Sequence, residues 1–367
     1  MKFRRSVKCS TKFATKHKKQ ELTKILAEYG RVCNFFIQFF WKAEVPHKFQ
    51  LLKNTIDMPN TWLSARLRKV AAREAIDMIQ AVKQRWKNKP SKIKMPIHRG
   101  KRMCVSSTIA DLQPSEETTF DAWLHLSSIG NKTIIDIPIQ YHRQFNKWNS
   151  KGKRLNAYII TSDYIQFVFE METKPKKILG KVIGIDTGIK ALASTSDGKQ
   201  FGKDIEKHLE RINRCKYGSR NQKRRRNALR QYIDEVVKEI VEENPRLIVV
   251  EKLNNLNHKT KLKRRLSRNM RRSLGNWNYR YWLSRLQQAT EENRISFRQV
   301  LPAYTSQRCS NCGHTERRNR KGEVFRCLEC SHTQNADINA ALNILQRFLQ
   351  GPYGALYKPK ELGNVQV

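Results

Sequence analysis

Three acidic residues stand in apolar surroundings where a chain normally keeps charge away. Asp186 ends the stretch VIGID at 182–186, and Glu251 ends the stretch LIVVE at 247–251. Asp337 lies in NADINAALNIL, in the first turn of an expected helix. A buried carboxylate without a partner is costly, so a hydrogen bond, a cationic side chain or a metal must compensate each one.

Taken singly, each acid has an ordinary structural explanation, such as an aspartate that complements the dipole at a helix N-terminus. Held together, carboxylates repel one another and take up protons unless a divalent cation lies among them. Hard oxygen ligands suit Mg²⁺ or Mn²⁺, and two such ions can activate water and stabilise the leaving oxygen of a phosphodiester. Asp186, Glu251 and Asp337 are therefore candidate catalytic and metal-binding residues.

Four of the eight cysteines form two CxxC pairs, Cys309/Cys312 and Cys327/Cys330. Fourteen residues separate the pairs, which is the spacing of a zinc ribbon with a structural four-cysteine Zn²⁺ site. Redox chemistry at one CxxC is the alternative. The remaining cysteines are scattered and suit a reducing compartment better than a disulfide framework; they are Cys9, Cys33, Cys104 and Cys215.

Strands alternate with helices from about residue 178 onward, which predicts an α/β domain around the three acids. RLIVVEKL and RISFRQVLP read as strands, and a final helix is expected from about Ala336 to Leu349. Two basic runs, at 220–230 and 259–272, are candidates for contact with a nucleic acid backbone. Trp277, Tyr281 and Trp282 could stack on bases, but packing inside the domain is the favoured interpretation.

The first half predicts a helical block inserted into a β unit. Its first dozen residues form a basic strand, apolar residues then recur at helical spacing from Glu21, and alternation typical of strands follows from about 102 to 174. Pro138 suggests an edge strand, and Pro175 begins a boundary.

The chain carries 73 Lys and Arg against 32 Asp and Glu, a net charge of +41 in 367 residues. Such an excess indicates a polyanionic partner, with nucleic acid as the natural one; a merely basic, solvated protein is the plainer alternative. No apolar run approaches the length of a membrane span, and the basic N-terminus lacks the apolar stretch of a secretory signal. We expect a cytoplasmic, nucleoid-associated protein with no membrane partner.

Four segments in order resemble the RuvC-like nuclease of TnpB proteins, which are encoded by insertion sequences and related to compact type V CRISPR effectors and to Fanzor proteins. The segments are GIDTG at 184–188, VVEKL at 249–253, TSQRCSNCG at 305–313 and NADINAALNIL at 335–345. The resemblance is specific over 180–350. Over 1–175 it rests on layout alone.

The resemblance implies an RNA-guided DNA endonuclease that cuts double-stranded target DNA beside a short adjacent motif, with guide RNA as partner. Asp186, Glu251 and Asp337 would be its Mg²⁺- or Mn²⁺-binding catalytic acids, and the four clustered cysteines its Zn²⁺ ligands. Asp186 and Glu251 are only 65 positions apart. The helical segment between them therefore looks short for this family, which affects guide handling rather than the acids.

The implied fold class is α/β plus β-barrel: a RuvC-like, ribonuclease-H-like domain with an inserted zinc ribbon, preceded by a wedge barrel that a helical recognition lobe interrupts. The expected segments are 1–15 and 102–177 for the wedge β-barrel, 16–101 for the recognition lobe, 178–308 and 331–350 for the nuclease, 309–330 for the zinc ribbon and 351–367 for a C-terminal tail.

Two other functions fit parts of the sequence. GIDTG also resembles the phosphate-binding hairpin of actin-like ATPases and sugar kinases, but no further glycine-rich phosphate loop follows residue 200, and neither the charge nor the cysteines are explained. An RNA-guided DNA-binding protein or transposition accessory factor without cleavage activity is the main alternative. The presence of all three acids favours cleavage.

Overall fold

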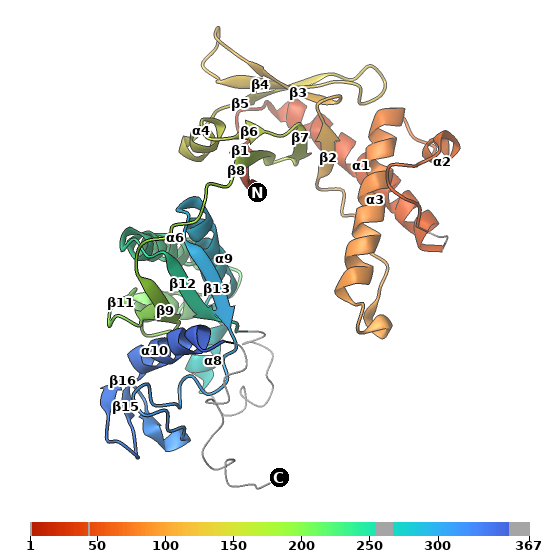
Figure 1. Ribbon diagram of the computed structural model, residues 1–367. Coiled ribbons are helices and arrows are strands. Elements are labelled where there is room, and N and C mark those ends of the chain that lie inside the picture. Colours follow the sequence, from red (N-terminus) through yellow and green to blue (C-terminus); the bar gives the residue numbers. More distant parts are fainter. Residues whose placement is uncertain (1, 43–44, 254–266, 352–367) are drawn as a thin grey trace. The chain divides into compact units, whose positions relative to one another are not determined.

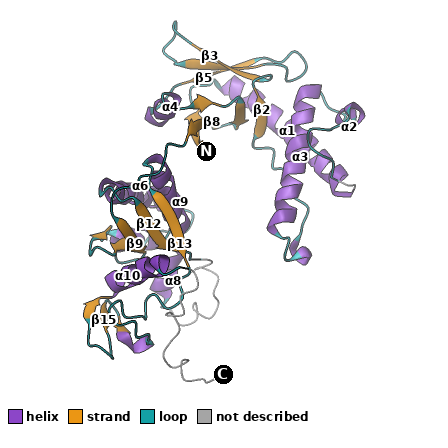
Figure 2. Cartoon of the chain, viewed as in Figure 1, coloured by secondary structure: helices purple, strands orange, loops and turns teal. Residues whose placement is uncertain are grey.

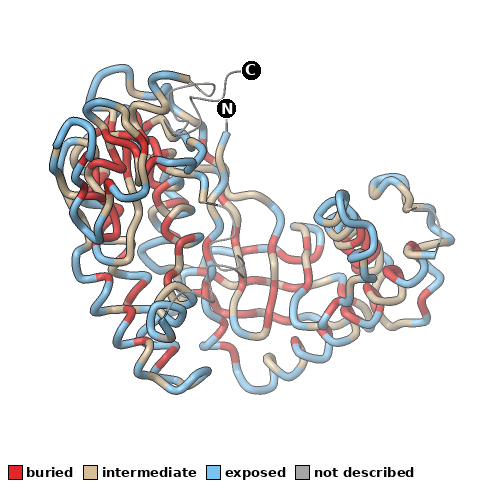
Figure 3. The backbone as a smooth tube through the Cα atoms, turned by 90° about the horizontal axis from the view of Figure 1, so that it is seen from below, coloured by how far each residue is buried: buried red, intermediate tan, exposed pale blue. Residues whose placement is uncertain are grey.

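The computed structural model describes residues 2–42, 45–253 and 267–351. The chain divides into two compact units, Met1–Thr173 and Lys174–Val367, and each unit has a hydrophobic core of its own. Buried residues follow the inner faces of helices and strands, and exposed ones gather in loops and on outer helix faces (Figure 3). Among the described residues, no helix combines the length and the apolar character that a membrane span requires.

The first unit combines long helices with antiparallel strands (Figure 1). Apolar residues of α1 and α3 recur at helical spacing and pack the two helices against each other. The elements in order are β1 (Lys2–Ser10), α1 (Lys16–Lys42), α2 (Lys53–Asp57), α3 (Ala65–Arg85), a 3₁₀ turn (Pro90–Lys92), β2 (Met103–Ser106), β3 (Ala110–Pro114), β4 (Ala122–Leu126), β5 (Ile135–Ile139), α4 (Arg143–Asn149), β6 (Lys153–Arg154), β7 (Ala157–Ile160) and β8 (Tyr164–Glu172).

These strands form two sheets, and the expected β-barrel is not found among the described residues. One sheet has the order β1-β8-β7-β2 with β6 also on β8, and the other has the order β3-β4-β5. Both contribute to one core with α1 and α3. The alternation in the sequence indicates one buried face per strand, which open sheets and a barrel share. Barrel closure depends on pairing of the outermost strands, which alternation does not reveal. Pro138 does lie on an edge strand, because β5 pairs with β4 alone.

A buried carboxylate ties the helices of this unit to the segment that precedes β2. Glu74 on α3 is 7% exposed, and its carboxylate accepts a 2.8 Å hydrogen bond from the Tyr29 hydroxyl on α1. Arg102 lies 2.9 Å from the other carboxylate oxygen. Burial alone would raise the pKa of Glu74, but these contacts and His98 lower it, so the carboxylate stays ionised.

The second unit is an α/β layer structure around a five-stranded sheet of order β11-β10-β9-β12-β13 (Figure 2). Strands β9, β12 and β13 are parallel, and β10 runs antiparallel to β9. The elements in order are β9 (Val182–Asp186), β10 (Ala193–Thr195), β11 (Gln200–Phe201), α5 (Ile205–Asn213), α6 (Arg220–Glu242), β12 (Leu247–Glu251), α8 (Arg268–Asn276), α9 (Tyr279–Glu292), β13 (Ser296–Val300), a 3₁₀ turn (Arg317–Asn319), β14 (Arg320–Lys321), β15 (Val324–Arg326), β16 (Thr333–Asn335) and α10 (Ala336–Leu349).

Helices cover both faces of this sheet. Ile183 and Val250 pack with α5, α6 and α9 on one face, while Val249 packs with Ile344 of α10 on the other. Helix α10 lies so close to β9 that a Cβ on Gly184 would collide with the Ala341 carbonyl oxygen. The basic run at 220–230 lies in α6, and Tyr281 and Trp282 of the aromatic segment lie in α9. Trp277 precedes α9, and both Trp277 and Trp282 are buried in the core, as the favoured interpretation predicts. Residues 259–266 of the other basic run lie outside the described residues.

Candidate active site

The fold brings all three predicted acids to one edge of the sheet. Strands β9 and β12 are parallel neighbours with Val250 opposite Ile185, so Asp186 and Glu251 come next on adjacent strands. Side chains alternate along a strand, and these two acids therefore share the face that α10 covers. Asp337 lies in the first turn of α10. The three carboxyl groups converge between the carboxyl ends of the strands and the N-terminus of α10.

Asp186 carries the clearest electrostatic sign of this convergence. Burial raises its pKa from an ordinary 3.8 to about 8, and the negative charges of Glu251 and Asp337 add to the effect. The Arg320 guanidinium and the Thr187 N–H act in the opposite direction. At neutral pH the cation-free protein therefore holds a proton on Asp186.

Glu251 is held from two sides. Its backbone carbonyl accepts a 3.0 Å hydrogen bond from the Tyr279 hydroxyl, and its carboxylate accepts one from the hydroxyl of Thr305. Burial raises the pKa of Glu251, while the Thr305 hydrogen bond and the charges of Arg347 and Arg320 lower it. The hydroxyl of Thr305 thus favours the ionised form of this carboxylate.

Asp337 pairs with an arginine from the cysteine module, which is the segment 309–330 that contains the two CxxC pairs. The Arg320 guanidinium lies 2.8 Å from its carboxylate, whose side chain is 15% exposed. Asn335 is the N-cap of α10, and its side-chain oxygen accepts hydrogen bonds from the backbone N–H groups of Asp337 and Ile338. This N-cap fixes the first turn of α10 and with it the position of the carboxylate.

The three acids offer hard carboxylate oxygens, the donor type that Mg²⁺ and Mn²⁺ prefer. Burial and the neighbouring carboxylates raise the pKa of Asp186, and a divalent cation among the three acids would oppose that shift. The carboxylates are less tightly gathered than the cysteines. Across the described ranges, only the four cysteines place all their ligand atoms within 4.8 Å of one another. Two of the acids are instead engaged by Thr305 and Arg320.

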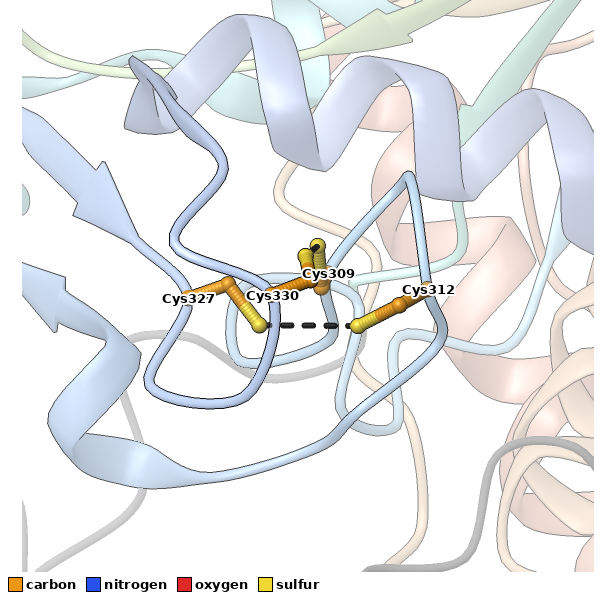
Figure 4. Close-up of side chains that lie close together, drawn as sticks. All are labelled: Cys309, Cys312, Cys327 and Cys330. Carbon is orange, nitrogen blue, oxygen red and sulfur yellow. Dashed lines mark hydrogen bonds between the residues drawn. The ribbon is translucent and has the colours of Figure 1, made fainter.

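The four predicted cysteines converge beside the N-terminal end of α10, where Cys309 and Cys327 pack with Ala336, and their sulfur atoms face one another (Figure 4). The Sγ–Sγ distances are 3.7 Å for Cys309 and Cys330 and 3.5 Å for Cys312 and Cys327. Tetrahedral zinc with Zn–S bonds of about 2.3 Å places its ligands about 3.8 Å apart. The cluster is therefore consistent with zinc. The His332 backbone N–H is the first cause that lowers the pKa of Cys330, which favours the thiolate form that binds zinc.

Side chains of α10 also form hydrogen bonds with the loop that connects β13 to the first CxxC pair. The side-chain amide of Asn339 donates to the Arg308 carbonyl at 2.8 Å, and its oxygen accepts the N–H of Ser310. Asn343 donates to the Thr305 carbonyl at 2.9 Å. One turn further, Arg347 donates to the carbonyls of Leu301 and Ala303. The side chains at positions 339, 343 and 347 thus lie along one face of α10 and hydrogen-bond to the backbone of the loop 301–310.

Several of these residues were not expected from the sequence. Arg320 was one basic residue among many in its loop, and nothing in the pattern distinguished it. Thr305 opens the segment TSQRCSNCG, which drew attention only for its cysteines. A signal did exist for Asn339 and Asn343, because polar residues four positions apart in an otherwise apolar helix share one face.

One family model and several known proteins match parts of this chain. Residues 279–344 match the family described as Cas12f1-like, TNB domain. "Putative RNA-guided DNA endonuclease InsQ" of Escherichia coli (strain K12) is 33% identical over 50% of this chain and 53% of that protein. Cas12f1 of Sulfoacidibacillus thermotolerans, a CRISPR-associated endodeoxyribonuclease, is 43% identical over 20% of this chain and 18% of its own. A TnpB-like protein of Aquifex aeolicus (strain VF5) is 32% identical over 32% of this chain and 37% of its own.

Solved structures match over most of the chain. A Cas12f1-sgRNA-target DNA complex gives a TM-score of 0.57 at 14% identity, covering 90% of this chain and 83% of that one. The mini-RNA-guided endonuclease CRISPR-Cas_phi3 gives 0.61 at 10% identity, covering 94% and 92%. At these identities the likeness shows the fold. The chain spans about half the length of InsQ and smaller parts of the other two relatives. With the family match and the sequence relatives, these findings show that the chain is similar to TnpB-like and Cas12f1 proteins.

Proposed function

We propose that this protein is an RNA-guided DNA endonuclease that hydrolyses phosphodiester bonds of a target DNA beside a short adjacent motif, in a RuvC-like site formed by Asp186, Glu251 and Asp337. The observation that carries the proposal is the convergence of the three acids at one sheet edge, where Asp186 acquires a pKa of about 8. The named functions of the relatives support DNA as substrate and guide RNA as partner.

In this site, bound Mg²⁺ or Mn²⁺ would activate water and stabilise the leaving oxygen of the phosphodiester. The residues of the chain would prepare that chemistry. Thr305 orients Glu251, the N-cap at Asn335 fixes Asp337, and Arg320 brings positive charge to the edge that a negatively charged backbone must approach.

The proposal extends to the remaining parts of the chain. The four cysteines would hold a structural Zn²⁺ ion. Residues 16–101 would serve as the recognition lobe, and 1–15 with 102–177 as the wedge, which in the described residues consists of open sheets. The nuclease would comprise 178–308 and 331–350.

A basic hollow on the second unit offers a surface for a phosphate backbone. It measures about 410 Å³ and lies between the end of α5 and the start of α6. Its lining includes Arg211, Arg214, Arg224 and Arg225. With a net charge of +41 on the whole chain, we expect binding there to weaken steeply with salt.

A cleavage assay tests the proposal. The full-length protein with its copurified RNA should cut a matching DNA in Mg²⁺ and not in EDTA, and Asp186→Ala should abolish cutting. Asp204→Ala is the matched control, since Asp204 is an exposed acid of the same unit that pairs with Lys207. Cutting retained by Asp186→Ala would remove Asp186 from the mechanism.

The second candidate is RNA-guided DNA binding without cleavage, as in a repressor or a transposition accessory factor. The Arg320–Asp337 pair is the observation that favours it, because it engages one of the three acids. Guided binding by the parent protein with no cutting in Mg²⁺ or Mn²⁺ would support this candidate over the nuclease.

A further inference from the structure

The hydroxyl of Thr305 lies at the junction between the cysteine module and the acid site. Thr305 is 2% exposed, and its hydroxyl donates to the Glu251 carboxylate. The other acceptor near this hydroxyl is the Pro302 carbonyl, at 3.4 Å. Glu251 is the better acceptor, because hydrogen bonds to an ionised group are shorter and stronger than those between neutral groups.

The backbone of Thr305 is fixed by the helix that carries Asp337. Asn343 is fully buried, and its amide donates to the Thr305 carbonyl at 2.9 Å and to the Arg308 carbonyl at 2.7 Å. The Arg347 guanidinium binds the Ala303 carbonyl at 2.7 Å. Helix α10 therefore carries one acid itself and controls the loop that orients another.

We propose that Thr305 is a positioning residue, which fixes one carboxylate oxygen of Glu251 so that the other is presented to a divalent cation shared with Asp186 and Asp337. A glutamate has rotatable bonds that an aspartate lacks, so Glu251 needs such a partner most. The hydroxyl donates a single proton to one carboxylate oxygen, which leaves the second oxygen available as a ligand. Outer partners of this kind typically change metal affinity about 10- to 100-fold when they are removed.

The inference rests on the proposed function for the identity of the cation site, but its test measures metal binding without cleavage. Mn²⁺ affinity of the full-length protein is measured by electron paramagnetic resonance for the parent and for Thr305→Val, which keeps the shape and removes the hydroxyl. We expect a loss of about tenfold or more in affinity. Thr305→Ser restores the hydroxyl and should restore affinity to within about threefold of the parent.

Matched controls separate positioning from simple loss of packing. Thr290→Val makes the same change at another buried threonine, whose hydroxyl donates to the Gln287 carbonyl on α9; it should leave Mn²⁺ affinity unchanged. Should Thr305→Val fail to fold, Thr305→Ala removes the hydroxyl without adding bulk and serves as the test.

Equal Mn²⁺ affinity for the parent and a folded Thr305→Val or Thr305→Ala protein would overturn the inference, and so would failure of Thr305→Ser to restore affinity. Glu251→Gln identifies the site: Mn²⁺ binding that survives this substitution would also overturn it. If the protein never cuts DNA but Thr305→Val still weakens Mn²⁺ binding, the proposed function fails and the positioning role of Thr305 stands.

Discussion

Divalent-ion binding by this protein is expected to depend steeply on pH, because a proton must leave Asp186 before its carboxylate can act as a ligand. The pKa of Asp186 is raised to about 8 in the cation-free protein, first by burial and then by the neighbouring Glu251 and Asp337 carboxylates. Glu251 is raised as well, mainly by burial. Because both pKa values are raised, Asp186 and Glu251 keep their protons to a higher pH than ordinary carboxyl groups do.

The magnitude follows from the pKa of Asp186. At pH 8 about half of the molecules carry an ionised Asp186, and at pH 6 about 1% do, so apparent affinity for the cation should fall about 50-fold between these values. A carboxyl group with an ordinary pKa near 3.8 would be ionised throughout this range. In that case the affinity would not change between pH 6 and pH 8.

Mn²⁺ titrations followed by electron paramagnetic resonance from pH 6 to pH 8 measure this dependence. Asp186→Asn is the control, since it removes the titrating group and should flatten the curve while it weakens binding. A histidine elsewhere in the chain would leave a pH dependence in this variant. Affinity of the parent protein that stays constant from pH 6 to pH 8 would refute the electrostatic account of the site.

Four further outcomes are expected. Raising the pH from about 4 to 8 should lower the free energy of unfolding of the cation-free protein, because the folded state keeps a proton on Asp186 that the unfolded state has already released. Urea titrations at several pH values measure this decline. Its absence in the parent protein, or an equal decline in Asp186→Asn, would contradict the prediction. Gly184→Ala should destabilise the protein by about 1–3 kcal/mol, since its new Cβ meets the α10 backbone, and chemical denaturation measures the loss. Cys327→Ser should reduce the bound zinc measured by atomic absorption and lower the melting temperature, whereas Cys215→Ser, outside the cluster, should change neither. Glu74→Gln should cost about 1–3 kcal/mol of unfolding free energy in the first unit, because it weakens the buried contacts with Tyr29 and Arg102; an unchanged denaturation midpoint would show that these contacts contribute little.

The sequence predicted those features that local pattern determines. Two apolar runs that end on acids became adjacent parallel strands, and an acid in the first turn of a helix completed the group. The spacing of two CxxC pairs was enough to predict a four-cysteine cluster. Each of these signals is confined to a short segment, so no knowledge of long-range pairing was needed to find its residues.

Features that depend on contacts between distant segments escaped prediction. Alternation in the first unit could not distinguish open sheets from a closed barrel, since both bury one face of every strand. The pairing of Arg320 with Asp337 depends on how a 3₁₀ turn and a short strand bring the cysteine module over the end of α10. The hydrogen bond from Thr305 to Glu251 joins residues 54 positions apart. Its geometry depends on the hydrogen bonds by which Asn343 of α10 holds the backbone of Thr305 and Arg308.

Anomalous scattering from Mn²⁺ in crystals of the protein would test the central claim most directly, since it locates the ions without reference to activity. We expect anomalous density among the carboxylates of Asp186, Glu251 and Asp337. Mn²⁺ bound elsewhere on the protein, with no density between these three side chains at saturating concentration, would contradict it.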